Sequence, residues 1–208
     1  MDKIDSVNAS TEQNYGKIAK AISWIFHPFV IVIPTMIISM NATTGDLVGA
    51  IGWSALCVAF VIAPAILYIR RKLKRKEYTD ADISVREHRF GIYVFAGACE
   101  LLCLATLIIF GAPKILIACF FAAILTLVIG TILNTQTKVS AHMAAMGGCT
   151  AVLFYISPVL GTVMVVASIA VGWARIYLKQ HTLGQVVIGW GVAVASVFLV
   201  FGLYPFGQ

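Results

Sequence analysis

Seven long apolar runs constrain this chain more than any other feature of its sequence. They are separated by short polar segments and lie at about 21–40, 47–69, 92–111, 115–133, 144–157, 159–173 and 186–203. A helix needs about 20 apolar residues to cross a bilayer. Apolar residues make up 60% of the 208 residues and charged residues only 12%, about half of what soluble domains carry. We therefore predict an all-α, polytopic transmembrane helix bundle with six to seven spans.

The domain organisation follows from the same runs. Residues 1–20 are polar and lack the apolar core and small-residue cleavage site of a secretory signal peptide. Residues 21–208 are predicted to form one membrane domain. His27-Pro28 and Pro34 interrupt its first run, which predicts a bent or re-entrant span with a structural role for His27. The five cysteines lie inside apolar runs without metal-ligand spacing, so we expect them to pack in the bundle.

The largest polar segment, residues 70–89, has two parts. Residues 70–76 include six basic side chains next to an apolar run, which predicts binding to anionic lipid head groups. Farther along, Arg86 and Arg89 are three residues apart and would share one face of a helix. Two guanidinium groups on one face predict a phosphate clamp. Nucleic acid is not an expected partner, because the basic run adjoins a span and has no interleaved aromatic residues.

The number of apolar runs between polar segments predicts where those segments meet. Two runs lie between Arg89 and the polar segment 134–142, and two more lie between that segment and the polar segment within 172–189. If each run crosses the membrane, all three segments emerge on the same side. Every lysine and arginine except Lys114 belongs to that side, so the positive-inside tendency predicts that it is cytoplasmic. We expect an integral protein of a bacterial inner membrane.

The polar residues of these segments supply the groups that phosphoryl transfer requires without a metal: a nucleophile, an acid and cations. His181 is the candidate nucleophile, which would form a phosphohistidine, and His142 is the candidate acid. Gln185 follows His181 by four residues, so it would accept a hydrogen bond from the imidazole and fix its tautomer. Arg175 would hold the phosphoryl oxygens beside them. The remaining candidate phosphate ligands are Arg86, Arg89, Lys138 and the Ser140 hydroxyl.

The three segments resemble the signature motifs of the type 2 phosphatidic acid phosphatase superfamily of membrane lipid phosphatases. Those motifs read Lys-x6-Arg-Pro, Pro-Ser-Gly-His and Ser-Arg-x5-His-x3-Asp. The third is the closest, because Arg175, His181 and Gln185 keep its spacing, although Ala174 and Gln185 replace the Ser and the Asp. The sequence His-Thr-x-x-Gln-Val at 181–186 is similar to the dolichyl diphosphatase branch, where Gln also takes the Asp position.

The other two motifs are less complete. The second appears as Val139-Ser140-Ala141-His142, which keeps the Ser and the His. In the first, Arg89 is followed by Phe90 instead of proline, and Asp82 stands at the Lys position. The missing cation would come from Arg86 or Lys138.

The resemblance covers about residues 80–191 and implies a lipid phosphatase that works through a phosphohistidine without a metal or other cofactor. Its substrate would be phosphatidic acid, phosphatidylglycerophosphate or a polyprenyl diphosphate such as undecaprenyl diphosphate. A neutral Gln185 stabilises an imidazolium less than aspartate does. We therefore expect slow chemistry or a substrate with a good leaving group.

Two other functions fit parts of the pattern. A lipid phosphotransferase of the same architecture would use the same histidine but pass the phosphate to another lipid alcohol. A small transporter or channel would need polar residues near the middle of the membrane and internal symmetry. Only Glu100 and the prolines favour that alternative.

Overall fold

The computed structural model describes residues 2–204, with side chains described from Glu12 onward. Helices account for most of this part of the chain, because the apolar runs satisfy their backbone hydrogen bonds internally. The order is α1 (Asp2–Ile25), α2 (Pro28–Thr44), α3 (Leu47–Cys57), the π-helix η1 (Val58–Ile62), α4 (Ala63–Lys74), the 3₁₀ turn η2 (Arg86–His88), α5 (Arg89–Ile109), α6 (Lys114–Leu133), α7 (Ala141–Ile156), α8 (Pro158–Tyr177) and α9 (Leu183–Leu203).

Within the described residues, five helical segments are long and apolar enough to cross a membrane: Leu47–Lys74, Arg86–Ile109, Lys114–Leu133, Pro158–Tyr177 and Leu183–Leu203. The consecutive helices α1 and α2 are bent by 46° and make a sixth if they cross together. With 16 residues, α7 is about 24 Å long at 1.5 Å per residue, shorter than a hydrocarbon core of about 30 Å. The all-α membrane bundle is confirmed, and the described helices supply five spans, or six if α1 and α2 cross together.

The bend lies at the predicted histidine and proline. His27 is the N-cap of α2, where its Nδ1 accepts a hydrogen bond from the Phe29 backbone N–H at 3.3 Å. Pro28 occupies the first turn of α2, where its missing N–H leaves no hydrogen bond unmade. Pro34 remains inside α2. The break is therefore set by the His27-Pro28 pair.

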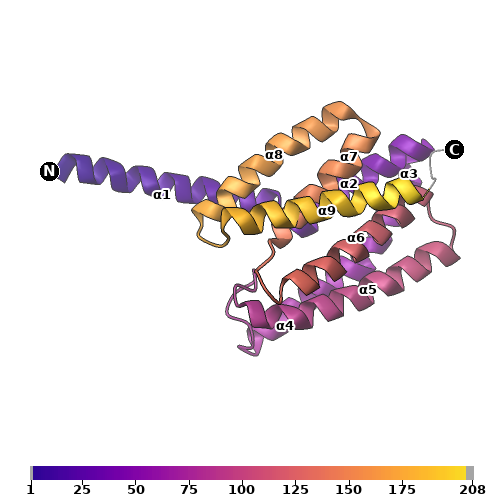
Figure 1. The fold of residues 1–208 in the computed structure, drawn as a ribbon, viewed down its shortest axis with the longest axis horizontal. Helices are drawn as coiled ribbons and strands as arrows, with labels where there is room; N and C mark the ends of the chain where they lie inside the picture. The colour runs from indigo at the N-terminus through magenta and orange to yellow at the C-terminus, as the bar shows by residue number, and fades with distance from the viewer. Residues whose placement is uncertain (1, 205–208) are drawn as a thin grey trace.

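Glycines bring α7 and α9 into close contact. A Cβ at Gly147 would lie 2.4 Å from the Trp190 carbonyl oxygen, and one at Gly189 would lie 2.7 Å from the Ser140 carbonyl oxygen. α8 packs against α7, and α6 packs against α9. Figure 1 shows that the α4–α5, α6–α7 and α8–α9 links lie at the same end of the bundle.

Candidate active site

The three polar links are joined by direct contacts at that end of the bundle. Arg89 Nη1, at the start of α5, donates to the Val139 carbonyl in the α6–α7 link at 2.6 Å. Lys138 Nζ, in the same link, donates to the Gln180 carbonyl in the α8–α9 link at 3.0 Å. The predicted convergence of three separate segments on one side of the bundle is therefore confirmed.

His181 lies in the α8–α9 link and is held by the first turn of α9. Its Nδ1 lies 3.0 Å from Gln185 Oε1. The same oxygen accepts the Thr182 backbone N–H at 3.3 Å, and Thr182 caps α9 in return. Because the Thr182 N–H requires an acceptor, the oxygen of the Gln185 amide must face this way. His181 Nδ1 therefore carries the hydrogen, and its Nε2 keeps a lone pair that can attack a phosphorus atom.

The surroundings of His181 keep its ring neutral. Only 6% of the residue is exposed. Burial lowers the pKa of His181 to about 4; the hydrogen bond that its Nδ1–H donates to Gln185 opposes this, and the charges of Arg89, Lys138 and Arg175 add to it. At neutral pH the imidazole is therefore unprotonated, as a nucleophile must be.

Arg175 is a buried cation near the end of α8. It is 3% exposed, and its Nη2 lies 3.3 Å from Asp82 Oδ2. Its Nε is buried and has no hydrogen-bond partner among the described residues. A buried N–H without an acceptor is costly, so an anion that met it would be stabilised.

Asp82 is a part of the site that the sequence did not identify as functional. Its Oδ2 accepts hydrogen bonds from Arg175 at 3.3 Å and from Gln180 Nε2 at 2.8 Å. Burial alone would raise the pKa of Asp82, but the neighbouring charge of Arg175 and these hydrogen bonds leave it below its ordinary value. Asp82 is therefore ionised, and a substrate phosphate would share Arg175 with it.

Arg89 and Lys138 connect the links and contribute positive charge. Besides the Val139 bond, Arg89 donates from Nε to the Ile83 carbonyl at 2.9 Å and from Nη2 to the Asp82 carbonyl at 3.4 Å. Burial lowers the pKa of Lys138 below its ordinary value, and the nearby guanidinium groups add to this effect. Arg89 fixes the links with its hydrogen bonds and acts on the site through its charge.

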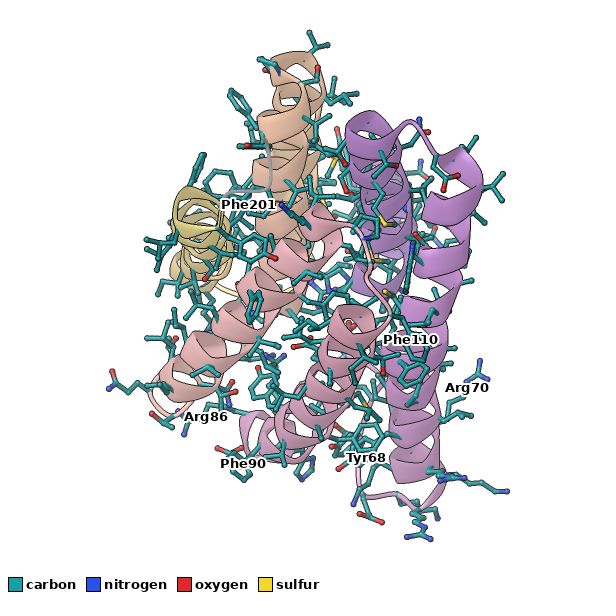
Figure 2. The ribbon with its side chains drawn as sticks, turned by 90° about the vertical axis from the view of Figure 1, so that its right-hand side faces the viewer. Tyr68, Arg70, Arg86, Phe90, Phe110 and Phe201 are labelled. Atoms are coloured by element: carbon teal, nitrogen blue, oxygen red, sulfur yellow. The ribbon has the colours of Figure 1, made fainter. Side chains whose placement is uncertain are left out.

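Arg86 does not join this cluster. α5 begins only at Arg89, so Arg86 lies in the 3₁₀ turn before it. Its Nη1 donates to the Thr135 and Gln136 carbonyls at the end of α6, at 3.2 and 3.3 Å. Its side chain lies at the outer edge of the bundle (Figure 2). Arg86 therefore binds the start of the α6–α7 link, whereas Arg89 binds the Val139 carbonyl farther along the same link, and the clamp stays a prediction.

Ser140 and His142 lie at the start of α7. Ser140 is fully buried, and its Oγ accepts the Met143 N–H at 3.4 Å, which leaves the hydroxyl hydrogen unused by this cap. The ring of His142 meets the ring of His27 edge to face, with the centroids 5.2 Å apart. One potential ligand atom from each of His27, Asp82 and His142 lies within 4.8 Å of the others.

His27 has a contact that the sequence did not predict. Its cap of α2 agrees with the predicted structural role, yet its ring also faces His142. The His-Pro pair was visible in the sequence. The contact between His27 and His142 was not visible, because these residues are 115 positions apart in the sequence.

The side-chain nitrogen and oxygen atoms of His27, Asp82 and His142 suit a hydrogen-bonded cluster better than a metal site. His27 Nδ1 accepts a backbone N–H, so the neutral ring carries its hydrogen on Nε2 and has no lone pair left for a cation. Asp82 is already bonded to Arg175 and Gln180. The His27 Nε2–H is therefore a donor at this point.

None of the family models, curated proteins or solved structures with which we compared the chain matches it. The resemblance to the lipid phosphatases therefore depends on the quoted residues. Of these, the third motif is supported by a contact, since His181 and Gln185 are bonded at 3.0 Å.

Proposed function

We propose that the chain is an integral membrane lipid phosphatase. It transfers the phosphoryl group of a lipid phosphate or polyprenyl diphosphate to His181 and then to water, without a metal. One observation carries the proposal: a buried, neutral imidazole with its lone pair on Nε2 lies in the field of three cations. These are Arg89 at the start of α5, Lys138 in the α6–α7 link and Arg175 near the end of α8. If these cations served only to form structural ion pairs, a neutral histidine beside them would not be needed.

In the proposed mechanism, the lone pair of His181 Nε2 attacks phosphorus as the bond to the lipid oxygen breaks. Burial keeps His142 neutral, so it takes the proton of a substrate phosphate monoanion and passes it to the departing oxygen. The positive cluster offsets the charge on the phosphoryl oxygens. His142 then takes a proton from water, whose oxygen attacks the phosphohistidine. Inorganic phosphate leaves, and His181 Nε2 regains its lone pair. Gln185 holds the ring in one orientation throughout.

The basic residues of 70–76 support the proposed membrane orientation. They end α4 and begin the link that reaches the site, so they lie at the same end of the bundle as the cluster. The Arg70 side chain points away from the helices (Figure 2), where anionic lipid head groups would lie. We propose that this end faces the cytoplasm of a bacterial cell.

The test is phosphate release by the full chain in lipid nanodiscs with a chelator present. Phosphatidic acid, phosphatidylglycerophosphate and a polyprenyl diphosphate serve as substrates. His181→Ala should reduce release by about 10³-fold or more, the scale of losing a covalent nucleophile. His88→Ala is the matched control, because His88 stacks on Tyr78 with ring centroids 5.7 Å apart and belongs to another contact.

Three outcomes would contradict parts of this proposal. Undiminished release by His181→Ala removes the nucleophile. Loss of activity in chelator removes the metal-free mechanism. Transfer of phosphate to an added lipid alcohol in place of release would favour the lipid phosphotransferase.

A further inference from the structure

A cavity of about 330 Å³ lies inside the helix bundle. Its wall is predominantly apolar and comes from α2, α3, η1, α5, α6, α7 and α9. Ligand pockets in proteins are typically about 300–1,000 Å³ in volume. The cavity is therefore large enough for a ligand.

The small residues at the start of α7 form one side of this cavity. Ala141, Ala144 and Gly148 line it, and their spacing of three and four residues places them on one face of the helix. A Cβ at Gly148 would meet no atom within 4 Å, in contrast to Gly147, which packs on α9. The small side chains on this face therefore leave space that the bundle does not fill.

One end of the cavity adjoins the segment that carries Ser140, and the other end lies in the apolar part of the bundle. At one end it is lined by Val139 and Ala141, the two neighbours of Ser140, and by Gly189. The Val139 carbonyl also accepts the hydrogen bond from Arg89. Farther along α7 the wall reaches Val152, about 16 Å from Ala141 at 1.5 Å per residue.

The polar groups of the wall are mostly engaged with their own helices. Thr35, Ser39 and Thr126 donate to backbone carbonyls one turn earlier, at 2.8 to 3.1 Å. Glu100 differs from these three, since its buried Oε2 has no hydrogen-bond partner in the described part of the chain. A neutral carboxyl is the form that can lie beside apolar groups at least cost.

We propose that this cavity receives a single apolar chain of the substrate while its phosphate lies among Arg89, Lys138 and Arg175. The inference rests on the proposed function and specifies its substrate class: a phosphate or diphosphate on one alkyl or prenyl chain. A protein cavity of about 150 Å³ accommodates benzene, so 330 Å³ holds roughly a dozen carbon atoms. Two acyl chains exceed that volume. Part of the wall, from α2, α3 and η1, lies outside the segment that resembles known phosphatases.

The test measures binding without hydrolysis. Dodecylphosphonate, which has no phosphate ester bond to cleave, is titrated into the full chain in nanodiscs. Gly148→Phe fills the cavity and should weaken binding at least tenfold. Gly191→Phe is the matched control in α9: a Cβ there also meets nothing within 4 Å, and Gly191 does not line the cavity. It should change the dissociation constant less than twofold. Thermal unfolding of each variant checks its fold, and Ala144→Leu replaces Gly148→Phe if that variant fails to fold.

Equal binding of dodecylphosphonate by the cavity variant and by Gly191→Phe would overturn the proposal. So would a diacyl phosphatidic acid that binds as tightly as dodecylphosphonate, because the cavity would then not select one chain. These results are independent of phosphate release. A chain that binds dodecylphosphonate in the cavity but releases no phosphate would refute the proposed phosphatase activity and keep the binding site.

Discussion

Replacing Gln185 by glutamate tests how His181 is held and which group titrates. Glutamate has the same length as glutamine, so its carboxylate would occupy the position of Oε1, 3.0 Å from His181 Nδ1. It would also keep the cap of α9, because glutamate is a standard partner of an N-cap threonine such as Thr182. The change therefore adds one negative charge with little change in geometry.

The magnitude follows from the hydrogen bond. The pKa of about 4 for His181, against an ordinary value of 6.5, corresponds to about 3 kcal/mol against the charged ring. A hydrogen bond with a charged group contributes about 1.5–3 kcal/mol, and a neutral one about 1 kcal/mol. A carboxylate therefore favours the imidazolium by about 1 kcal/mol more than the amide does. This difference should raise the pKa of His181 above its value in the natural chain.

The assay is the pH dependence of kcat/KM for lipid phosphate hydrolysis. Only the neutral ring attacks, so activity should fall as the pH drops through the pKa of His181 in the free enzyme. We expect this acid limb near pH 4 in the natural chain and about one pH unit higher in Gln185→Glu. Gln185→Leu, which removes the acceptor, is the control and should move the limb to lower pH.

An acid limb that stays in place in Gln185→Glu would refute this reasoning. Either the group that titrates is not His181, or its Nδ1 does not share a hydrogen with Gln185. Titration of ¹⁵N-labelled histidine rings by NMR separates these two explanations.

Three further changes test the packing around the site by thermal unfolding in detergent. Asp82→Asn leaves Arg175 as a buried, unpaired cation and should destabilise the chain by about 2 kcal/mol, below the usual range for a buried pair because the Asp82 side chain is 28% exposed. Gly189→Ala places a methyl group 2.7 Å from a backbone carbonyl oxygen at the start of α7 and should cost about 1–3 kcal/mol, whereas Gly191→Ala has open space and should cost less. Glu100→Leu removes a buried oxygen without a described partner and should raise stability by about 1–3 kcal/mol. For each variant, a change in stability opposite to the expected one would contradict the argument.

The third polar segment was the most predictable part of the site. His181 lies just before the N-cap of α9, and Gln185 is the N3 residue whose side chain folds back over that cap. A contact over four residues of this kind depends only on local structure. Arg86 and Arg89 have comparable spacing, and the 3₁₀ turn η2 continues directly into α5. Their hydrogen-bond partners lie 49 and 50 residues farther along the chain, in the α6–α7 link, and local spacing does not predict contacts of that range.

The sequence by itself determined that this chain is a helical membrane bundle and that its three polar segments gather at one end. Length and apolarity decide whether a run can cross a bilayer, and the number of crossings decides on which side each link emerges. Only the tertiary structure decided that His27 and Asp82 join His142, that Arg86 binds the link after α6, and that the small residues of α7 border a cavity. These features depend on which helices pack together and in which rotation, and contacts between distant residues fix that rotation.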